Sequence, residues 1–194
     1  MRGVGAGGWN QSGQPSVILS PQYMPSLDGS VLVNTSDDTT CALNEAGEVR
    51  CWGLNTHGQI GLSPTDPSMS QCPANNGQCE GHIFHPLPHR IQGLEPVLDV
   101  VAGFQNTCAI TRENELFCWG RSDMGILGIL EDDMPCGQDM NAGRCQPTPQ
   151  RIQGLGSVHR VAISKNHACA ASADGRLRCW GNNQYGSLGI GCEL

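Results

Sequence analysis

The sequence is poor in charged and aromatic residues, and it contains no long uninterrupted hydrophobic run. Charged residues make up 15% of the 194 residues and aromatic residues make up 5%. Because no apolar stretch approaches the length needed to cross a bilayer, we expect no membrane span. The net charge of −7 and the scattered lysines and arginines argue against direct binding of nucleic acid, which needs clustered positive charge.

The sequence also lacks the familiar catalytic fingerprints. It contains no nucleophile elbow, phosphate-binding loop, zinc-protease helix or dinucleotide fingerprint. Two adjacent acidic pairs, Asp37-Asp38 and Asp132-Asp133, are poor acid/base dyads, because neighbouring residues on a strand point to opposite faces. We therefore expect no enzymatic activity, no cofactor and no metal site.

Glycine, proline and cysteine, by contrast, are abundant, with 26, 12 and 11 residues respectively. This mixture is typical of many short strands joined by tight turns, and it does not suit a helical bundle. One phrase occurs three times: a Cys, nine residues, and then Cys-Trp-Gly. The copies begin at Cys41, Cys108 and Cys169. Recurrence at this spacing indicates one supersecondary unit per copy.

The repeat extends well beyond the cysteines. Residues 86–129 align on residues 147–190 without a gap, with 19 of 44 positions identical, and the first copy joins at an offset of 67 residues. We divide the chain into the tail of a preceding repeat (1–14), repeat 1 (15–62), a cysteine-containing insert (63–85), repeat 2 (86–129), a second such insert (130–146), repeat 3 (147–190) and the start of a truncated insert (191–194).

The two cysteines of each phrase are predicted to face each other in a β-hairpin. Pairing Cys41 with Cys51 leaves residues 45–47 as a three-residue loop, whose last residue must tolerate a positive φ. The three copies place Gly47, Asn114 and Gly175 at that position, and these residue types adopt such a conformation readily. Turn chemistry and cysteine register therefore agree.

A cross-strand pair of this kind brings the two Cα atoms to about 4.5 Å, at the short end of the range that a disulfide accepts. We predict three hairpin disulfides: Cys41–Cys51, Cys108–Cys118 and Cys169–Cys179. The alternative is that these cysteines are reduced, buried thiols that pack as small hydrophobic residues.

The two inserts each contain a further cysteine pair. Cys72 with Cys79 and Cys136 with Cys145 are predicted to close irregular loops, and Cys192 is left unpaired. Zinc held by the first pair together with the histidines at 82, 85 and 89 is an alternative. The spacing within the pair does not fit a zinc knuckle, and the second insert has no matching histidines.

The pattern Pro-x-x-Ile-x-Gly-Leu, Val-x-x-Val, Thr-Cys-Ala and Cys-Trp-Gly-x-Asn-x-x-Gly-x-Leu-Gly resembles the regulator of chromosome condensation repeat family. The resemblance covers nearly the whole chain. It implies an all-β, partial β-propeller of about three four-stranded blades, with a blade remnant at the N-terminus. It also implies that Trp52, Trp119 and Trp180 pack inside the blades. The founding member of the family promotes nucleotide exchange on a small nuclear GTPase and binds chromatin.

Because the repeated residues build blades while the inserts differ, we expect a non-enzymatic module that binds a protein partner, with a glycan also possible. The alternative is a guanine-nucleotide exchange factor or chromatin-associated regulator, by family analogy. Both chain ends break off within a repeat, so we expect a fragment of a longer propeller or an arc that assembles with another copy. The cysteine content favours an extracellular or cell-surface location, although residues 1–8 do not form a signal peptide.

Overall fold

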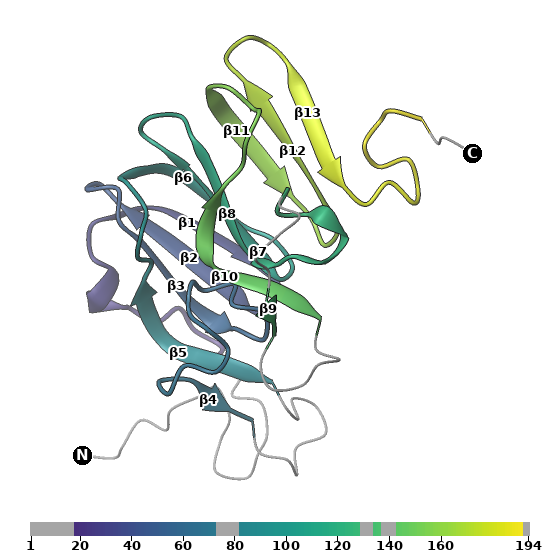
Figure 1. Cartoon of the computed structure of the whole chain (residues 1–194). Helices are drawn as coiled ribbons and strands as arrows, with labels where there is room; N and C mark the ends of the chain where they lie inside the picture. The colour runs from purple at the N-terminus through teal and green to yellow at the C-terminus, as the bar shows by residue number, and fades with distance from the viewer. Residues whose placement is uncertain (1–17, 73–81, 129–133, 137–142, 192–194) are drawn as a thin grey trace, which may run out of the picture.

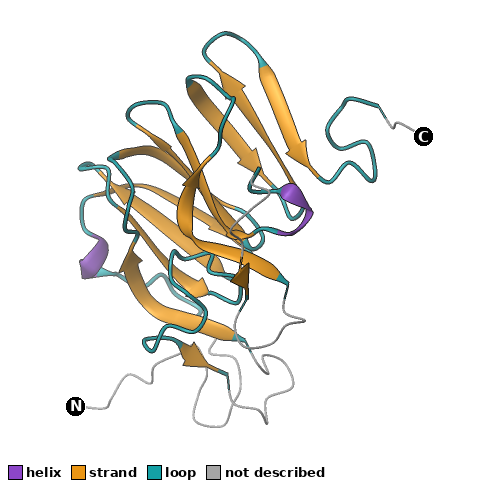
Figure 2. Cartoon of the chain, viewed as in Figure 1, coloured by secondary structure: helices purple, strands orange, loops and turns teal. Residues whose placement is uncertain are grey.

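The structure, a computed structural model, describes residues 18–72, 82–128, 134–136 and 143–191. Among these residues it contains strands and two short 3-10 turns, η1 (Pro25–Leu27) and η2 (Asp123–Gly125), and no α-helix (Figure 2). The all-β prediction is therefore confirmed. The strands are β1 (Ser30–Ser36), β2 (Thr39–Asn44), β3 (Val49–Leu54), β4 (Ser70–Gln71), β5 (Ile83–Arg90), β6 (Val97–Ala102), β7 (Asn106–Thr111), β8 (Leu116–Arg121), β9 (Met134–Pro135), β10 (Arg144–Arg151), β11 (Val158–Ile163), β12 (His167–Ser172) and β13 (Leu177–Gly181).

The strands form three antiparallel sheets that follow one another in chain order (Figure 1). The first sheet has the order β1-β2-β3-β5-β4, the second β6-β7-β8-β10-β9, and the third β11-β12-β13. Strand β6 contacts β1 and β2, and β11 contacts β6 and β7, so each sheet packs on the next. The three sheets form an open arc and do not close a ring.

The central hairpin of each sheet has the predicted register. Cys41 lies opposite Cys51, Cys108 opposite Cys118, and Cys169 opposite Cys179. The last residue of each hairpin loop has a positive φ, which is 86° at Gly47, 59° at Asn114 and 77° at Gly175. Glycine or asparagine therefore occurs at the loop position whose backbone has a positive φ, as the sequence predicts.

The fourth strand of a sheet comes from the start of the next sequence repeat. Strand β5 pairs with β3, and β10 pairs with β8, so Arg90 and Arg151 belong to the sheets of the preceding copies. The short strands β4 and β9 add a fifth strand to these two sheets. Among the described residues the third sheet has three strands, one fewer than expected, whereas the next repeat supplies the fourth strand of each of the first two sheets. The predicted N-terminal remnant (1–14) lies outside the described residues.

The core lies between neighbouring sheets. One cluster combines Cys41, Leu43 and Val49 of the first sheet with Val100 and Trp119 of the second. The other combines residues of the second sheet with those of the third, and its members include Ile110, Leu116, Ile152 and Val158. Since each sheet buries apolar side chains against its neighbours, stability in this arc depends on contacts between adjacent repeats. In the described part of the chain, no helix has the length and apolar character to span a membrane.

Candidate binding surfaces

The hairpin cysteines lie inside the sheets. The structure joins Cys41 to Cys51, Cys108 to Cys118 and Cys169 to Cys179, with a Cα–Cα separation of 4.1 Å in each pair. The first two pairs are fully buried, whereas the third, at the end of the arc, is partly exposed. The geometry thus accommodates a disulfide in every copy, and the oxidation state of these pairs in the cell stays a prediction.

The insert cysteines are described only in part. Cys136 and Cys145 are joined, with their Cα atoms 5.4 Å apart, and Cys72 is disulfide-bonded. Cys79 and Cys192 fall outside the described residues. His85 and His89 lie with their ring centroids 6.0 Å apart, but within the described ranges no group of three or more His, Cys, Asp and Glu side chains is placed to hold a metal ion.

The repeated tryptophans link one sheet to the one before it. The Trp119 indole is completely buried, and its Nε1 donates a hydrogen bond of 3.0 Å to the carbonyl of Gln59. In the same way Trp180 Nε1 donates to the carbonyl of Ile126 at 2.8 Å. Trp52 is partly exposed, and among the described residues its indole has no such acceptor. Trp119 and Trp180 therefore link neighbouring sheets. The Trp119 indole is buried, whereas Trp180 is partly exposed and lines a pocket.

The loops at one end of the sheets come together around a polar pocket of about 470 Å³. Arg121 lines the pocket: its Nε donates to Asp123 Oδ2 at 2.8 Å, and its Nη1 donates to Gln105 Oε1 at 3.3 Å. The Lys165 ammonium lies 4.8 Å from the centre of the Phe104 ring, within the range of a cation–π contact. The pocket is lined by residues of all three copies: His57, Phe104, Gln105, Arg121, Asp123, Gly143 and Lys165.

These loop residues differ from copy to copy, although the backbone around them is repeated. Gly53, Gly120 and Gly181 each have a φ above 100°. At the residue after each of them, the amide donates to the carbonyl of the loop after the first strand, as in the 2.9 Å bonds from Leu54 to Asp38 and from Arg121 to Gln105. We call this end of the sheets the loop face, and its residues are 37–38, 54–57, 104–105, 121–124, 165–166 and 182–185.

The sequence analysis did not single out the loop face, although a signal for it was present. Asp37, Phe104 and Lys165 align with one another, and so do His57, Met124 and Tyr185. Met124 and Tyr185 are 59% and 88% exposed. His57 and Phe104 are partly exposed. Unlike residue types at aligned surface positions beside repeated glycines are typical of a binding surface on a repeated scaffold.

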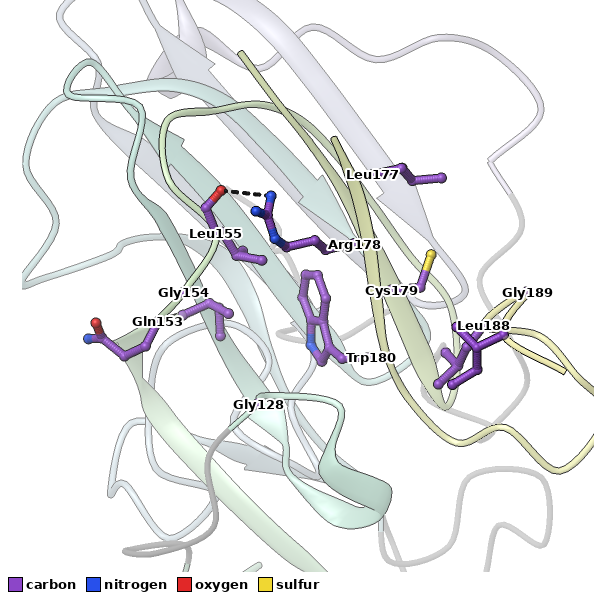
Figure 3. Close-up of a pocket in the computed structure, with 12 residues that line it drawn as sticks. Gly128, Gln153, Gly154, Leu155, Leu177, Arg178, Cys179, Trp180, Leu188 and Gly189 are labelled. Atoms are coloured by element: carbon purple, nitrogen blue, oxygen red, sulfur yellow. Dashed lines mark hydrogen bonds between the residues drawn. The ribbon is translucent and has the colours of Figure 1, made fainter. Parts of the chain in front are cut away.

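A second, more apolar pocket of about 740 Å³ lies along the free edge of β13 (Figure 3). Leu177, Arg178 and Trp180 of β13 line it. Arg178 and Trp180 point to one side of the strand and Leu177 to the other, and the turn containing Leu188 and Gly189 lies beside β13. The segment that follows β10 contributes Leu155, whose carbonyl accepts a 3.4 Å hydrogen bond from Arg178 Nη1. This groove is a surface of the third sheet that the first two sheets do not expose.

Three successive antiparallel sheets define an arc of a β-propeller: the next repeat completes each of the first two, and a tryptophan hydrogen bond links each sheet to the one before it. The sequence matches the model of the regulator of chromosome condensation (RCC1) repeat over residues 46–110 and 113–171, and a second model of the same repeat over residues 31–59, 97–126 and 158–187. The chain belongs to the RCC1 repeat family.

Relatives with similar sequences carry several names. The chain is 28% identical to the ultraviolet-B receptor UVR8 of Arabidopsis thaliana over 183 residues, which cover 92% of this chain and 36% of the receptor. It is 27% identical to the mouse secretion-regulating guanine nucleotide exchange factor, covering 89% of this chain and 36% of that protein. With the mouse regulator of chromosome condensation it shares 28% identity, over 98% of this chain and 41% of the relative. The chain thus spans little more than a third of their length.

Solved structures show the same fold. Prp20p from Saccharomyces cerevisiae, described with its binding properties to Gsp1p and histones, superposes with a TM-score of 0.67 at 22% identity, over 85% of this chain and 36% of Prp20p. Human WBSCR16 gives a TM-score of 0.65 at 23% identity, over 89% of this chain and 37% of that protein. The partial-propeller prediction is confirmed.

The prediction of an extracellular or cell-surface location is wrong. The relatives include regulators of chromosome condensation from mouse and, under the name Protein RCC1, from Candida albicans. The prediction relied on the number of cysteines. Cys41, Cys51, Cys108 and Cys118 are each 0% exposed, so these cysteines occupy core positions of a repeated hairpin. Each copy of the hairpin adds two buried cysteines to the chain. Their number therefore reflects the number of repeats and does not indicate a cellular compartment.

Proposed function

We propose that this chain is a non-catalytic, protein-binding arc of an RCC1-type regulator, and that its loop face contacts the partner. The observation that carries the proposal is the contrast between the repeated scaffold and the unlike loop residues, including Phe104, Met124 and Tyr185. Tyr185 and Met124 are exposed and Phe104 is partly exposed; aromatic residues, methionine and arginine are enriched in protein interfaces.

The names of the relatives support a particular kind of partner. One relative is named a guanine nucleotide exchange factor, and Prp20p is described as binding Gsp1p and histones. We therefore favour a guanine-nucleotide exchange or chromatin-regulator role over glycan binding. The loop face offers the exposed Lys165 for acidic groups and the exposed Tyr185 for apolar contacts, as a protein partner requires.

Direct binding measurements test the proposal. The chain is immobilised and titrated with Gsp1p, in its GDP-loaded and nucleotide-free forms, and separately with histones. An exchange factor binds the nucleotide-free GTPase more tightly and accelerates release of labelled GDP, because it must stabilise the empty nucleotide site. A chromatin-regulator role predicts histone binding that weakens as salt concentration rises.

A matched pair of variants separates the loop face from the other end of the sheets. Combined replacement of Phe104 and Tyr185 by alanine should weaken binding by about tenfold or more, as truncation of interface aromatics does. Replacement of Glu113, an exposed residue in the hairpin loop at the opposite end, should change it less than about twofold. Equal effects of both replacements, or no binding to either protein, would contradict the proposal.

A further inference from the structure

In the first two sheets the position of the fourth strand is filled by β5 and β10. In the third sheet, among the described residues, the equivalent position beside β13 is empty. In the first sheet the Ile91 amide donates a 2.9 Å hydrogen bond to the carbonyl of Val49, and in the second sheet Ile152 donates to Leu116 at 2.8 Å. Val49 and Leu116, which also pack against the following sheet, are 2% and 1% exposed, whereas Leu177 at the same position of β13 is 69% exposed. An edge of this kind accepts an added strand.

In the first two sheets a side chain of the fourth-strand segment packs against a glycine of the nearby turn. A Cβ placed on Gly61 would lie 2.7 Å from Ile91 Cδ1, and one placed on Gly128 would lie 3.5 Å from Ile152 Cγ2. Gly189 occupies the same place in the third copy, and nothing lies within 4 Å of it. The groove in Figure 3 therefore has room for an unbranched or branched aliphatic side chain.

The chain itself contains an unpaired copy of the segment that fills this position. Residues 21–27, Pro-Gln-Tyr-Met-Pro-Ser-Leu, align with Pro88–Leu94 and Pro149–Leu155, so that Met24 takes the place of Ile91 and Ile152. In the structure the segment from Ile18 to Met24 belongs to no strand. Tyr23 is 75% exposed and Met24 38% exposed.

We propose that residues 20–27 of a second copy of this chain lie along β13 as its fourth strand. Met24 then fills the space above Gly189, and its amide donates to the carbonyl of Leu177. The two copies join head to tail, with the first sheet of one following the third sheet of the other, so the contact repeats the one that links successive sheets within the chain. A head-to-tail contact of this type either closes a ring or propagates.

Charge complementarity with β13 favours residues 20–27 over the two aligned segments, residues 88–94 and 149–155, which carry an arginine. Arg90 pairs with Glu48 at 2.8 Å, and Arg151 pairs with Glu115 at 2.7 Å. The third copy has Arg176 where the first two have glutamate, so an arginine-bearing strand would meet like charge there. The segment at residues 20–27 carries Tyr23 instead of arginine. A tyrosine ring attracts a guanidinium group, and the Tyr23 hydroxyl already donates to Asp28, which adds a negative charge.

A second contact is complementary in the same head-to-tail arrangement. Trp119 and Trp180 donate to the backbone carbonyls of Gln59 and Ile126, the residues that follow the first glycine of the preceding turn. Ser187 holds that position in the last described turn, while Trp52 holds the donor position in the first sheet. Joining two copies therefore also brings the indole of Trp52 to the carbonyl of Ser187.

Sedimentation of the 194-residue chain across the micromolar range tests the proposal. We expect association that increases with concentration and that Met24→Asp weakens by about tenfold or more, since a carboxylate would be buried in the groove. Met24 makes no core contact in the single chain, so the thermal melt of the dilute variant should not change. Leu98→Asp, at a residue of the middle sheet that is 52% exposed, serves as the control and should associate normally. A monomer at all concentrations, or association insensitive to Met24→Asp, would overturn the proposal.

A charge exchange identifies the occupant. Tyr23→Arg should weaken association about two- to fivefold by meeting Arg176, and adding Arg176→Glu should restore it by recreating the Arg–Glu pair of the other sheets. A synthetic peptide of residues 19–28 should compete with association more effectively than a peptide of residues 147–156. If the arginine-bearing peptide competes better, or if Tyr23→Arg strengthens association, the groove takes a different strand and the proposal fails.

Discussion

At the residue scale, the same tryptophan has a different environment in each copy. Trp119 is completely buried and hydrogen-bonded to the preceding sheet, and Trp180 makes the equivalent bond, whereas Trp52 is partly exposed. The repeat phrase predicted that all three pack within blades, but it could not predict this gradation. The indole hydrogen bond occurs where a sheet precedes the tryptophan, and complete burial occurs only in the middle sheet, which has a neighbour on each side.

The difference between the tryptophans gives a stability prediction. Trp119→Phe removes a buried indole and leaves the Gln59 carbonyl with one donor fewer, so we expect a loss of about 1–3 kcal/mol in the free energy of unfolding. Trp52→Phe, the matched change at a partly exposed site, should lose less than about 1 kcal/mol. Urea denaturation of the dilute variants measures both values, and equal losses would contradict the assigned role of Trp119.

His89 gives a prediction about pH. Burial lowers the pKa of His89 below its ordinary value of 6.5, and the nearby His85 lowers it further, while Asp66 acts in the opposite direction. The folded state therefore binds fewer protons than the unfolded chain just below that pKa, so stability is full above about pH 6.5 and falls as pH decreases through that value. The melting temperature should fall between pH 7.5 and 5.5, and less so in His89→Gln.

The aligned residue in the third repeat is Gln150, so glutamine fits this strand position. His159→Gln, at an exposed histidine on β11, is the control and should keep the pH dependence of the unchanged protein. A fall in melting temperature that is the same with and without His89 would contradict the assignment.

At the scale of the elements, the hairpins could be predicted in detail from the sequence. Loop length, the residue that takes a positive φ and the facing cysteines all constrain one register, and the structure has that register. The exchange of the fourth strand could not be predicted in the same way. Arg90-Ile91 looks like the start of repeat 2 in the sequence, yet it pairs with β3, because pairing between separate repeats leaves no local pattern.

The glycine of Cys-Trp-Gly marks a close approach between two chain segments. Gly120 has a φ of 105°, and a Cβ there would overlap the carbonyl of Gln105 and lie 2.8 Å from the Cα of Asn106. Gly120→Ala should therefore cost more than about 2 kcal/mol of stability. Gly125→Ala, at a φ of 70° with nothing within 4 Å, should cost only the roughly 1 kcal/mol of the left-handed conformation. Chemical denaturation distinguishes the two, and similar costs would contradict the close approach.

At the scale of the whole molecule, the repeat was sufficient to predict a partial propeller but not its location in the cell. The cysteine count favoured an oxidising compartment, whereas the relatives include regulators of chromosome condensation. The loop face was also missed, because the sequence analysis gave weight to residues that recur. A binding surface on a repeat protein is found instead among the positions that differ, such as Asp37, Phe104 and Lys165.

The most direct test of the binding role is a hydrogen-exchange map of the chain in complex with Gsp1p or histones, whichever binds. We predict that protection on binding is concentrated in the loop face, with residues 104–105, 121–124 and 165–166 protected more strongly than the rest. Protection confined to the hairpin loops at residues 45–47, 112–114 and 173–175, at the opposite end of the sheets, would contradict the account.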